Sequence, residues 1–209
     1  MSQAKKQLII LSGYARSGKS TFLEVAKDLD CGVVSTSEIL HDFTNLLIRR
    51  LLGVRIDTKN KSDMTTLWFN IKQGVTSRTS IVSWLSRDIL INIAENCLVP
   101  VFGRDVFGLA AAKKIIHSRH KTLVYEAFNK SECDSMLHFL SSLDGLDNYE
   151  VHVVTIVRDD AEPGVDGREL LRGIYDEQDA VKSDCLISNN WSLEDFEDEV
   201  EEYLSIVTR

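Results

Sequence analysis

The 209-residue sequence lacks any pair of cysteines spaced for a metal site or a redox site. The four cysteines are Cys31, Cys97, Cys133 and Cys185. None of them form a C-x-x-C pair, which argues against both a zinc site and a thiol redox motif. We expect reduced, mostly buried thiols in a cytosolic protein. A chain of this length buries about 70% of its unfolded surface, so it needs neither a disulfide nor a structural metal to fold.

Long apolar runs are also missing. No segment reaches the ~20 consecutive apolar residues that a membrane-spanning helix requires. The apolar stretch Leu8–Leu11 near the N-terminus is too short for a signal peptide, and no cleavage site follows it. We therefore expect a soluble, cytoplasmic protein that has no membrane partner.

Positive charge is scarce as well. The chain has 24 lysines and arginines against 32 aspartates and glutamates, which gives a formal net charge of −8. Such a chain is not built to hold long nucleic acid through its overall field. A local basic groove stays open as an alternative, because basic residues cluster at Lys113, Lys114, His117, Arg119, His120 and Lys121, and again at Arg49–Arg50.

Short apolar segments alternate with segments of helical periodicity. We predict strands at 7–12, 31–35, 122–125, 150–157 and 185–188. Helices are predicted at 19–29, 38–52, 105–119, 131–143 and 191–207, with Ser37 and Ser192 as N-caps. This alternation predicts an α/β fold with a parallel sheet.

The chain is predicted to form one domain over residues 1–209 with two added segments. Residues 37–119 contain no confident strand, so we predict a helical insertion between the second and third strands, which would bind the acceptor. Residues 158–183 are charged and have Pro163, Gly164 and Gly167 near their start, which suggests a mobile, lid-like segment.

One motif carries specific chemistry. Residues 13–20 fit G-x-x-x-x-G-K-[ST], directly after a predicted strand and at the start of a predicted helix. Glycines let the backbone N–H groups cradle phosphate oxygens, and the positive end of the helix adds to this nest. Lys19 reaches the β- and γ-phosphates, and Ser20 ligates Mg²⁺. We therefore predict an ATP–Mg²⁺ site at Gly13, Tyr14, Ala15, Arg16, Ser17, Gly18, Lys19, Ser20 and Thr21.

Other segments resemble known kinases. Val33–Leu40 resembles the Ser-Thr-Gly-Asp segment of adenylate kinases, and Tyr125–Ser131 is similar to their Asp-Gly-Phe-Pro-Arg-Thr segment. Gly103–Gly108 and Asp184–Asn190 resemble segments of bacteriophage deoxynucleoside monophosphate kinases. The chain departs from adenylate kinases at Lys130, which stands where they have arginine.

The fold class that we predict is a P-loop NTPase, with three α/β/α layers around a five-stranded parallel sheet of order 2-3-1-4-5. The resemblance implies transfer of the γ-phosphoryl group of ATP to a nucleoside or deoxynucleoside monophosphate. The resemblance also suggests a phage origin, in which case the expected cytoplasmic location is the host cytoplasm. We expect the protein to be either a monomer or a homodimer.

Phosphoryl transfer depends mainly on positioning and on neutralising charge. As catalytic residues we predict Lys19, the arginines of the lid-like segment and one carboxylate near the reaction path: Arg158, Arg168, Arg172 and Glu38. Glu126 follows a predicted buried strand and would hold a Mg²⁺-bound water. The residues predicted to bind the acceptor are Thr36, Glu38, Arg78, Arg87, Arg104, Asp105 and Lys130.

Two alternatives stay open at this stage. The first is a kinase that phosphorylates a hydroxyl on DNA, at a polynucleotide end or on a hydroxymethylated base such as 5-hydroxymethyluracil. A hydroxyl acceptor requires a carboxylate base, for which Glu38 or Asp105 could serve, and the basic cluster could hold the DNA. The second is a switch that hydrolyses NTP, although the sequence has no convincing N-K-x-D motif for guanine.

Overall fold

The computed structural model describes residues 5–14, 16–52, 55, 57–60, 90, 93–126, 130–159 and 184–208. The chain divides into two compact units, of which the first combines Met1–Thr36 with Phe107–Arg209 and the second is Ser37–Val106. The second unit starts where the predicted insertion starts. It ends earlier than 119, because the chain belongs to the first unit again from Phe107 onward.

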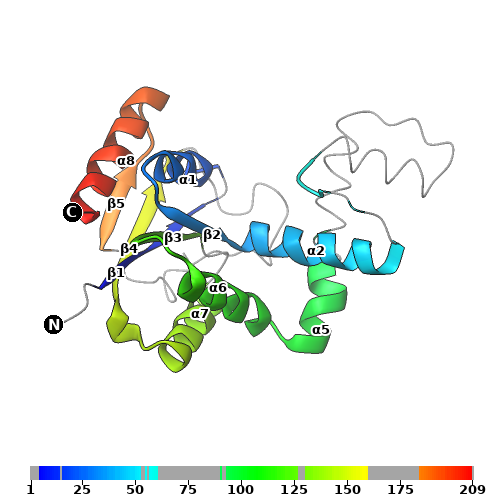
Figure 1. The fold of residues 1–209 in the computed structure, drawn as a ribbon. Helices are drawn as coiled ribbons and strands as arrows, with labels where there is room; N and C mark the ends of the chain where they lie inside the picture. Colours follow the sequence, from blue (N-terminus) through cyan, green and yellow to red (C-terminus); the bar gives the residue numbers. More distant parts are fainter. Residues whose placement is uncertain are drawn as a thin grey trace, which may run out of the picture. The chain divides into compact units, whose positions relative to one another are not determined.

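A five-stranded sheet forms the centre of the first unit (Figure 1). Its strands are β1 (Lys6–Gly13), β2 (Gly32–Ser35), β3 (Thr122–Glu126), β4 (Tyr149–Val157) and β5 (Cys185–Ser188). Their order is β2-β3-β1-β4-β5, and all four neighbouring pairs are parallel. The register pairs Leu11 with Glu126 and Gly13 with Ile156, so the carboxyl ends of β1, β3 and β4 lie along one edge of the sheet.

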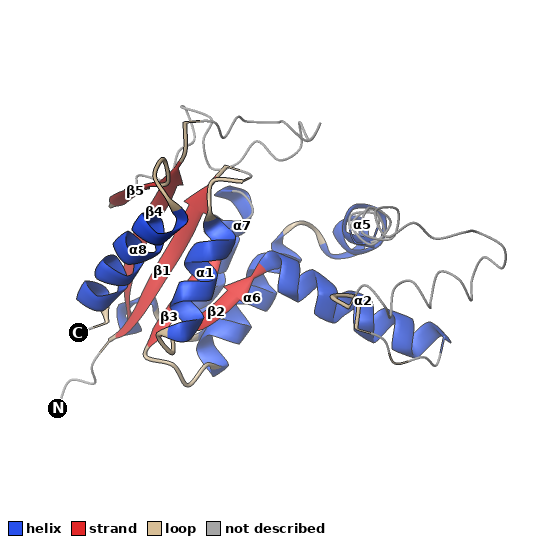
Figure 2. Cartoon of the chain, turned by 90° about the horizontal axis from the view of Figure 1, so that it is seen from above, coloured by secondary structure: helices blue, strands red, loops and turns tan. Residues whose placement is uncertain are grey.

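Helices cover both faces of this sheet (Figure 2). Helices α1 (Lys19–Asp28) and α8 (Leu193–Val207) lie on one face, and α6 (Asp105–His117) and α7 (Lys130–Leu143) lie on the other. A short 3-10 helix, Leu146–Asn148, leads into β4. The first unit therefore has the three-layer α/β/α architecture, and the predicted fold class and strand order are confirmed.

Strand periodicity explains why both faces are apolar. Side chains alternate between the two faces along a strand, so Ile9 and Leu11 of β1 join the core that includes Phe22 of α1 and Phe196 of α8. Their neighbours in β1 point to the opposite face, and these side chains are buried as well. A strand buried on both sides reads as a continuous apolar run, which is typical of central strands in parallel sheets.

The second unit is helical where it is described. Besides most of α2 (Thr36–Leu52), it contains a π-helix, Ala94–Leu98, followed by α5 (Val99–Phe102). A turn near residue 58 is held to α2, since Thr58 N–H donates to Asn45 Oδ1 at 2.9 Å and the Thr58 hydroxyl lies 2.7 Å from His41 Nδ1. None of the helices in the described part of the chain has the length and apolarity that a membrane span requires.

One of the two predicted helix caps needs a correction. Ser37 was predicted to cap α2, but the helix already begins at Thr36, directly after β2 ends at Ser35. Because the strand passes into the helix without a loop, Ser37 lies inside the first turn. The cap of α8 is as predicted: the Ser192 hydroxyl accepts from Asp195 N–H at 3.1 Å, and the Asp195 carboxylate accepts from Ser192 N–H at 3.3 Å.

Candidate phosphate-binding site

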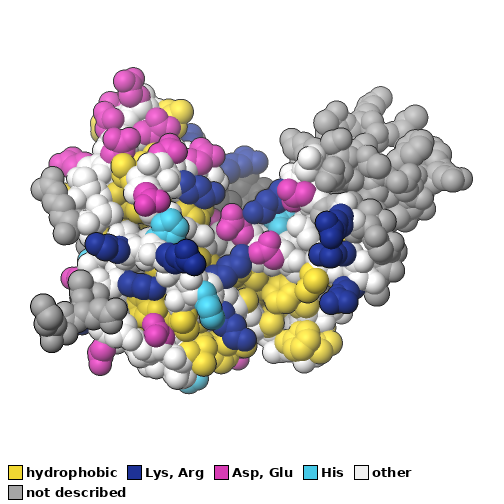
Figure 3. Space-filling view, in the orientation of Figure 1, with side chains coloured by type: hydrophobic (Ala, Val, Ile, Leu, Met, Phe, Trp, Pro, Cys, Tyr) yellow, Lys and Arg dark blue, Asp and Glu magenta, His cyan; other side chains and the backbone are white. Residues whose placement is uncertain are grey.

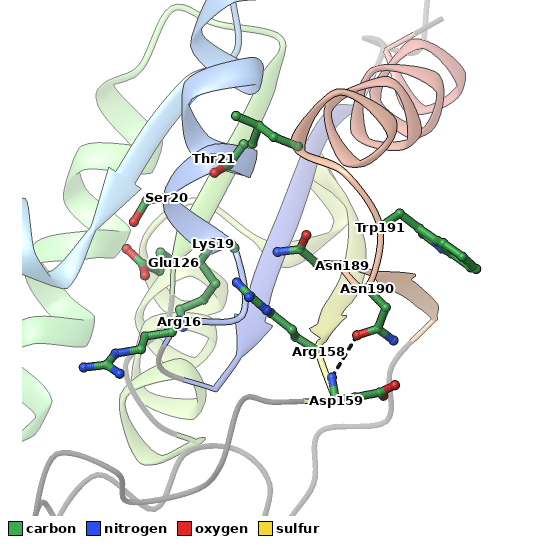
Figure 4. Close-up of a pocket in the computed structure, with 12 residues that line it drawn as sticks. Arg16, Lys19, Ser20, Thr21, Glu126, Arg158, Asp159, Asn189, Asn190 and Trp191 are labelled. Atoms are coloured by element: carbon green, nitrogen blue, oxygen red, sulfur yellow. Dashed lines mark hydrogen bonds between the residues drawn. The ribbon is translucent and has the colours of Figure 1, made fainter.

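A cavity of about 730 Å³ opens at the carboxyl edge of the sheet (Figure 4). Ligands in open α/β sheets bind at this edge, outside the carboxyl ends of the strands. The cavity is lined by residues that follow β1, β3, β4 and β5: Arg16, Gly18, Lys19, Ser20, Thr21, Glu126, Arg158, Asp159, Asn189, Asn190, Trp191 and Leu193. Seven of these twelve residues were predicted site residues, namely Arg16, Gly18, Lys19, Ser20, Thr21, Glu126 and Arg158.

The loop between β1 and α1 has a backbone that suits glycine at two positions. Gly13 has a φ of 156°, and a Cβ there would lie 2.5 Å from Ser17 Oγ and 3.0 Å from the Ile156 carbonyl. Gly18 has a φ of 115°, and a Cβ there would clash with Asn189 Nδ2. Arg16 also has a positive φ, 68°. Such conformations cluster at ligand-binding loops, where the surrounding structure enforces them.

Ser17 carries an unsatisfied hydroxyl at the centre of this loop. Its Oγ is fully buried and has no hydrogen-bond partner within the described residues. A buried polar atom without a partner costs free energy, so it usually indicates a ligand, a water or an ion at that place. The Ser17 carbonyl is held from the other side, because the Asn189 side chain donates to it from Nδ2 at 2.7 Å.

Lys19 is folded back onto the loop. Its ammonium donates to the Gly13 carbonyl at 2.5 Å and to the Tyr14 carbonyl at 2.8 Å. Burial lowers the pKa of Lys19 below its ordinary value, and the negative charge of Glu126 opposes this change. A partly desolvated cation beside inward-facing backbone N–H groups is suited to an anion such as a polyphosphate.

Glu126 provides the carboxylate of the site. It is the last residue of β3, next to β1 in the sheet, and its charge acts on Lys19. Figure 4 shows Glu126 on the same side of the loop as Ser20. A serine hydroxyl and one carboxylate are oxygen ligands of the kind that Mg²⁺ takes while it keeps several waters. The described residues contain no group of three or more His, Cys, Asp or Glu side chains that could hold a metal by themselves.

The loop after β5 forms the opposite wall of the cavity. The Asp159 N–H donates to Asn190 Oδ1 at 2.9 Å, and Asn190 Nδ2 donates to Ser188 Oγ at 3.1 Å. These bonds tie the end of β4, where Arg158 lies, to the end of β5. Figure 4 shows the Arg158 side chain extending toward Lys19, whereas Trp191 lies at the outer rim. Trp191 is 73% exposed.

Two predicted acceptor residues of the second unit, Arg104 and Glu38, form ion pairs within that unit. Arg104 makes two hydrogen bonds to the Glu95 carboxylate, at 3.3 and 3.0 Å, and both side chains are partly exposed. Glu38 forms an ion pair with Lys59 at 3.3 Å. Asp105 lies in the first turn of α6. Their roles stay predictions.

Lys130 begins α7 in the first unit, and its role also stays a prediction. Five predicted site residues lie outside the described residues: Ala15, Arg78, Arg87, Arg168 and Arg172.

Sequence reasoning missed a buried glutamate. Glu132, in the first turn of α7, is 4% exposed and accepts hydrogen bonds from Thr36 Oγ1 and, at 2.8 Å, from Tyr125 Oη. Burial raises the pKa of Glu132 to about 7, the two hydrogen bonds oppose this, and Glu126 adds to it. The available signal was helical spacing: Glu132 shares a face of α7 with the buried residues Met136 and Leu140.

Asn189, Asn190 and Trp191 were also missed as lining residues, although the segment around them was quoted as a resemblance. Only their place in the sequence could have identified them, since they directly follow the last predicted strand. In a parallel sheet such residues reach the same edge as those that follow the first strand.

The strand order, with a glycine-cradled loop after the central strand and a helix starting at Lys19, defines the P-loop nucleotide-binding fold. No family model and no curated protein matches the chain.

Three solved structures are similar over nearly the whole chain. A dephospho-CoA kinase from Campylobacter jejuni has 17% identity and a TM-score of 0.47, covering 97% of this chain and 98% of that one. The protein TT1252 from Thermus thermophilus has 14% identity and a TM-score of 0.45, covering 98% and 100%. A gluconokinase from Sinorhizobium meliloti has 14% identity and a TM-score of 0.39, covering 99% and 95%. Likenesses this remote say nothing about the substrate, which the chemistry of the chain itself must indicate.

Proposed function

We propose that the protein is an ATP-dependent phosphotransferase that moves the γ-phosphoryl group to a nucleoside or deoxynucleoside monophosphate. One observation carries this proposal: Lys19 at the start of α1 and Arg158 directly after β4 line one cavity with the carboxylate of Glu126 and a glycine-cradled loop. A transferring phosphoryl group develops charge on its equatorial oxygens, and cations placed around it stabilise that charge.

Each part of the cavity has a distinct task in this proposal. The N–H groups of the loop and of the first turn of α1 hold the triphosphate, and the Ser17 hydroxyl gains a partner when the loop is filled. Lys19 neutralises charge on the β- and γ-phosphates, and Arg158 adds a second positive charge from the end of β4. Ser20 and Glu126 would hold Mg²⁺, which polarises the phosphate oxygens when bound.

The choice of a monophosphate acceptor rests on chemistry and on resemblance. A phosphate acceptor is already ionised at neutral pH, so the enzyme needs cations to position it and no general base. The resemblance to nucleoside monophosphate kinases covers residues 33–40 and 125–131. These two segments contain the carboxyl ends of β2 and β3, which lie at the same edge of the sheet as the loop.

The position of the basic cluster argues against DNA as the acceptor. Residues 113–121 lie where α6 ends and β3 begins, so they belong to the amino-terminal edge of the sheet. Gln7 pairs with Thr122 at that edge, whereas the phosphate loop begins after Gly13 at the other. Six residues of strand separate the two edges by about 20 Å. Binding of DNA to this cluster would therefore not place the DNA at the phosphate loop.

The test is an acceptor panel with ATP–Mg²⁺, in which ADP release and labelled product are both followed. The panel holds the four dNMPs, the NMPs, 5-hydroxymethyl-dUMP, and DNA with and without hydroxymethyluracil. Lys19→Ala is the blank, and we expect its rate to fall about 10³-fold, because a phosphate-stabilising cation is lost from a water-poor site. Lys27→Ala is the matched control, since it removes the same charge from an exposed position in the last turn of the same helix.

The outcomes separate the candidates. Lys19-dependent turnover on one or two monophosphates supports the proposal and names the acceptor. Label that enters DNA, with no turnover on monophosphates, would replace the proposal with a hydroxyl kinase. ADP release that no acceptor accelerates would favour an NTP-hydrolysing switch.

A further inference from the structure

The buried Glu132 has no task in the proposed transfer. It stands on the face of α7 that also carries Met136 and Leu140, and both of these side chains are fully buried. An apolar residue of similar size would fill such a position without the cost of removing a carboxyl group from water. Packing alone therefore does not explain a carboxyl group at this position.

The partners of Glu132 come from the carboxyl ends of two neighbouring strands. Tyr125 is the penultimate residue of β3, and Thr36 directly follows β2. Both hydroxyls donate to the same carboxyl oxygen, Oε1, and all three side chains are buried. One oxygen of Glu132 therefore links the ends of β2 and β3 through side chains, in addition to the backbone pairing of the two strands.

That link encloses a residue of the phosphate cavity. Glu126 is bonded directly to Tyr125 and is paired in register with Ser35, the residue before Thr36. The two donors to Glu132 thus flank Glu126: Tyr125 precedes it in its own strand, and Thr36 directly follows its partner Ser35 at the end of the neighbouring strand. Glu126 lines the cavity, and its charge acts on Lys19.

We propose that Glu132 is a positioning residue, which fixes Glu126 in the phosphate cavity by holding the ends of β2 and β3 together through Thr36 and Tyr125. This inference rests on the proposed function, because it takes Glu126 to serve the ATP–Mg²⁺ site. Glu132 itself is buried behind the strand ends and is not among the residues that line the cavity.

Two substitutions of Glu132 separate positioning from packing. Glu132→Gln keeps an oxygen that accepts both hydroxyls, whereas Glu132→Leu keeps a similar volume and has no acceptor. Met136→Leu is the control, since it changes packing one turn further along the same buried face and conserves volume. The three variants are compared with the wild type in kcat, in KM for ATP and for the acceptor, and in the midpoint of thermal unfolding.

A second readout needs no acceptor. The Mg²⁺ concentration that half-saturates ATP binding is measured by equilibrium dialysis of labelled ATP with each full-length variant. This readout stays informative if no acceptor is found, so a failure of the proposed transfer and a failure of the role of Glu132 can be told apart.

We expect Glu132→Leu to lower kcat about tenfold or more and to raise the Mg²⁺ requirement, because a misplaced group near the reacting atoms costs rate steeply. Glu132→Gln should stay within about threefold of the wild type on both measures. If the leucine variant does not fold, Thr36→Val and Tyr125→Phe each remove one donor and should each show part of the effect. The proposal is overturned if Glu132→Leu, or both single-donor variants, match Met136→Leu in kcat and in Mg²⁺ requirement and differ only in the unfolding midpoint.

Discussion

The phosphate cavity and the second unit use their charges in opposite ways. In the second unit, Arg104 pairs with Glu95 and Glu38 pairs with Lys59, and all four side chains are partly exposed. In the cavity, Lys19 binds only carbonyl oxygens among the hydrogen bonds that the structure defines for it, and burial lowers its pKa. Exposed ion pairs contribute little to stability, whereas a partly desolvated cation at the start of a helix is suited to an anion. We therefore expect Lys19, and not the ion-paired residues, to meet a ligand. Charged side chains of both signs are also spread over the face of the molecule seen in Figure 3.

After Lys19→Ala, the largest effect should come from adding a side chain to the phosphate loop at Gly18. Gly18→Ala places a Cβ against Asn189 Nδ2 and 3.1 Å from Phe196, at a φ of 115°. We expect kcat/KM to fall more than about 10²-fold, because the loop must shift and the strain is of order 1–3 kcal/mol. Gly103→Ala in the second unit is the control: its φ is also positive, 76°, but a Cβ there has no neighbour within 4 Å. Equal losses in the two variants would contradict the prediction, because a Cβ at Gly103 meets no neighbouring atom.

Substitution of Arg158 in the cavity should change kcat, whereas substitution of Arg104 in the second unit should change the KM for the acceptor. Arg158→Ala should lower kcat about 10- to 10²-fold, since it removes a cation from the transition state, and Arg158→Lys should restore part of the rate. Arg104→Ala should raise the acceptor KM about tenfold and leave kcat nearly unchanged, as expected for a ligand that binds substrate and transition state alike. Steady-state kinetics with both substrates varied will show this. An unchanged acceptor KM would show that Arg104 does not bind the acceptor and only pairs with Glu95.

The pH dependence of stability should reveal the buried carboxyl behind the cavity. The folded-state pKa of Glu132 is raised from 4.5 to about 7, so the folded protein binds its proton more tightly than the unfolded chain does. The stabilisation from this proton is therefore complete below about pH 4.5 and is lost as the pH rises through about 7. Denaturant unfolding across this range should show the wild type losing roughly 1–3 kcal/mol of stability relative to Glu132→Gln as the pH rises, because glutamine does not titrate. Parallel curves would show that Glu132 titrates as in the unfolded chain.

The smallest effect should lie at the rim. Trp191 lines the cavity and is 73% exposed, so its ring is available to a nucleotide base. Trp191→Ala should raise the KM for ATP about three- to tenfold, which corresponds to the loss of one aromatic contact, and Trp191→Phe should restore most of the affinity. Leu186→Ala serves as a control, because this side chain is similarly exposed, at 64%, and does not line the cavity. An unchanged KM would place the base elsewhere.

Much of the fold could be predicted because its signals are local. Each of the five strands is a short apolar run, and each predicted boundary lies within two residues of the observed one. The phosphate loop is a contiguous motif, and Ser192 caps α8 through Asp195, three residues away. In all these cases the residues that determine the structure lie within one turn or one strand of each other, so the sequence displays the interaction directly.

The failures have a common cause in long-range contacts. Glu132 reads as a charged residue near a helix start, and only the approach of Thr36, 96 positions away, shows that its carboxyl is buried and bonded. Asn189 holds the Ser17 carbonyl across 172 positions. The start of α2 was misplaced for a related reason, since Thr36 turns inward to Glu132 and the chain enters the helix one residue before the cap that Ser37 would provide.

The sequence by itself determined that a glycine-bounded loop with the G-x-x-x-x-G-K-[ST] pattern follows the first strand, and that strands and helices alternate around a parallel sheet. Hydrophobic periodicity and glycine spacing act over a few residues, so they can be read without the fold. Only the tertiary structure decided that the ends of four strands enclose one cavity, that Arg158 faces Lys19, and that Glu132 joins β2 to β3. Those relations depend on strand order and register, which bring together residues that no local pattern connects.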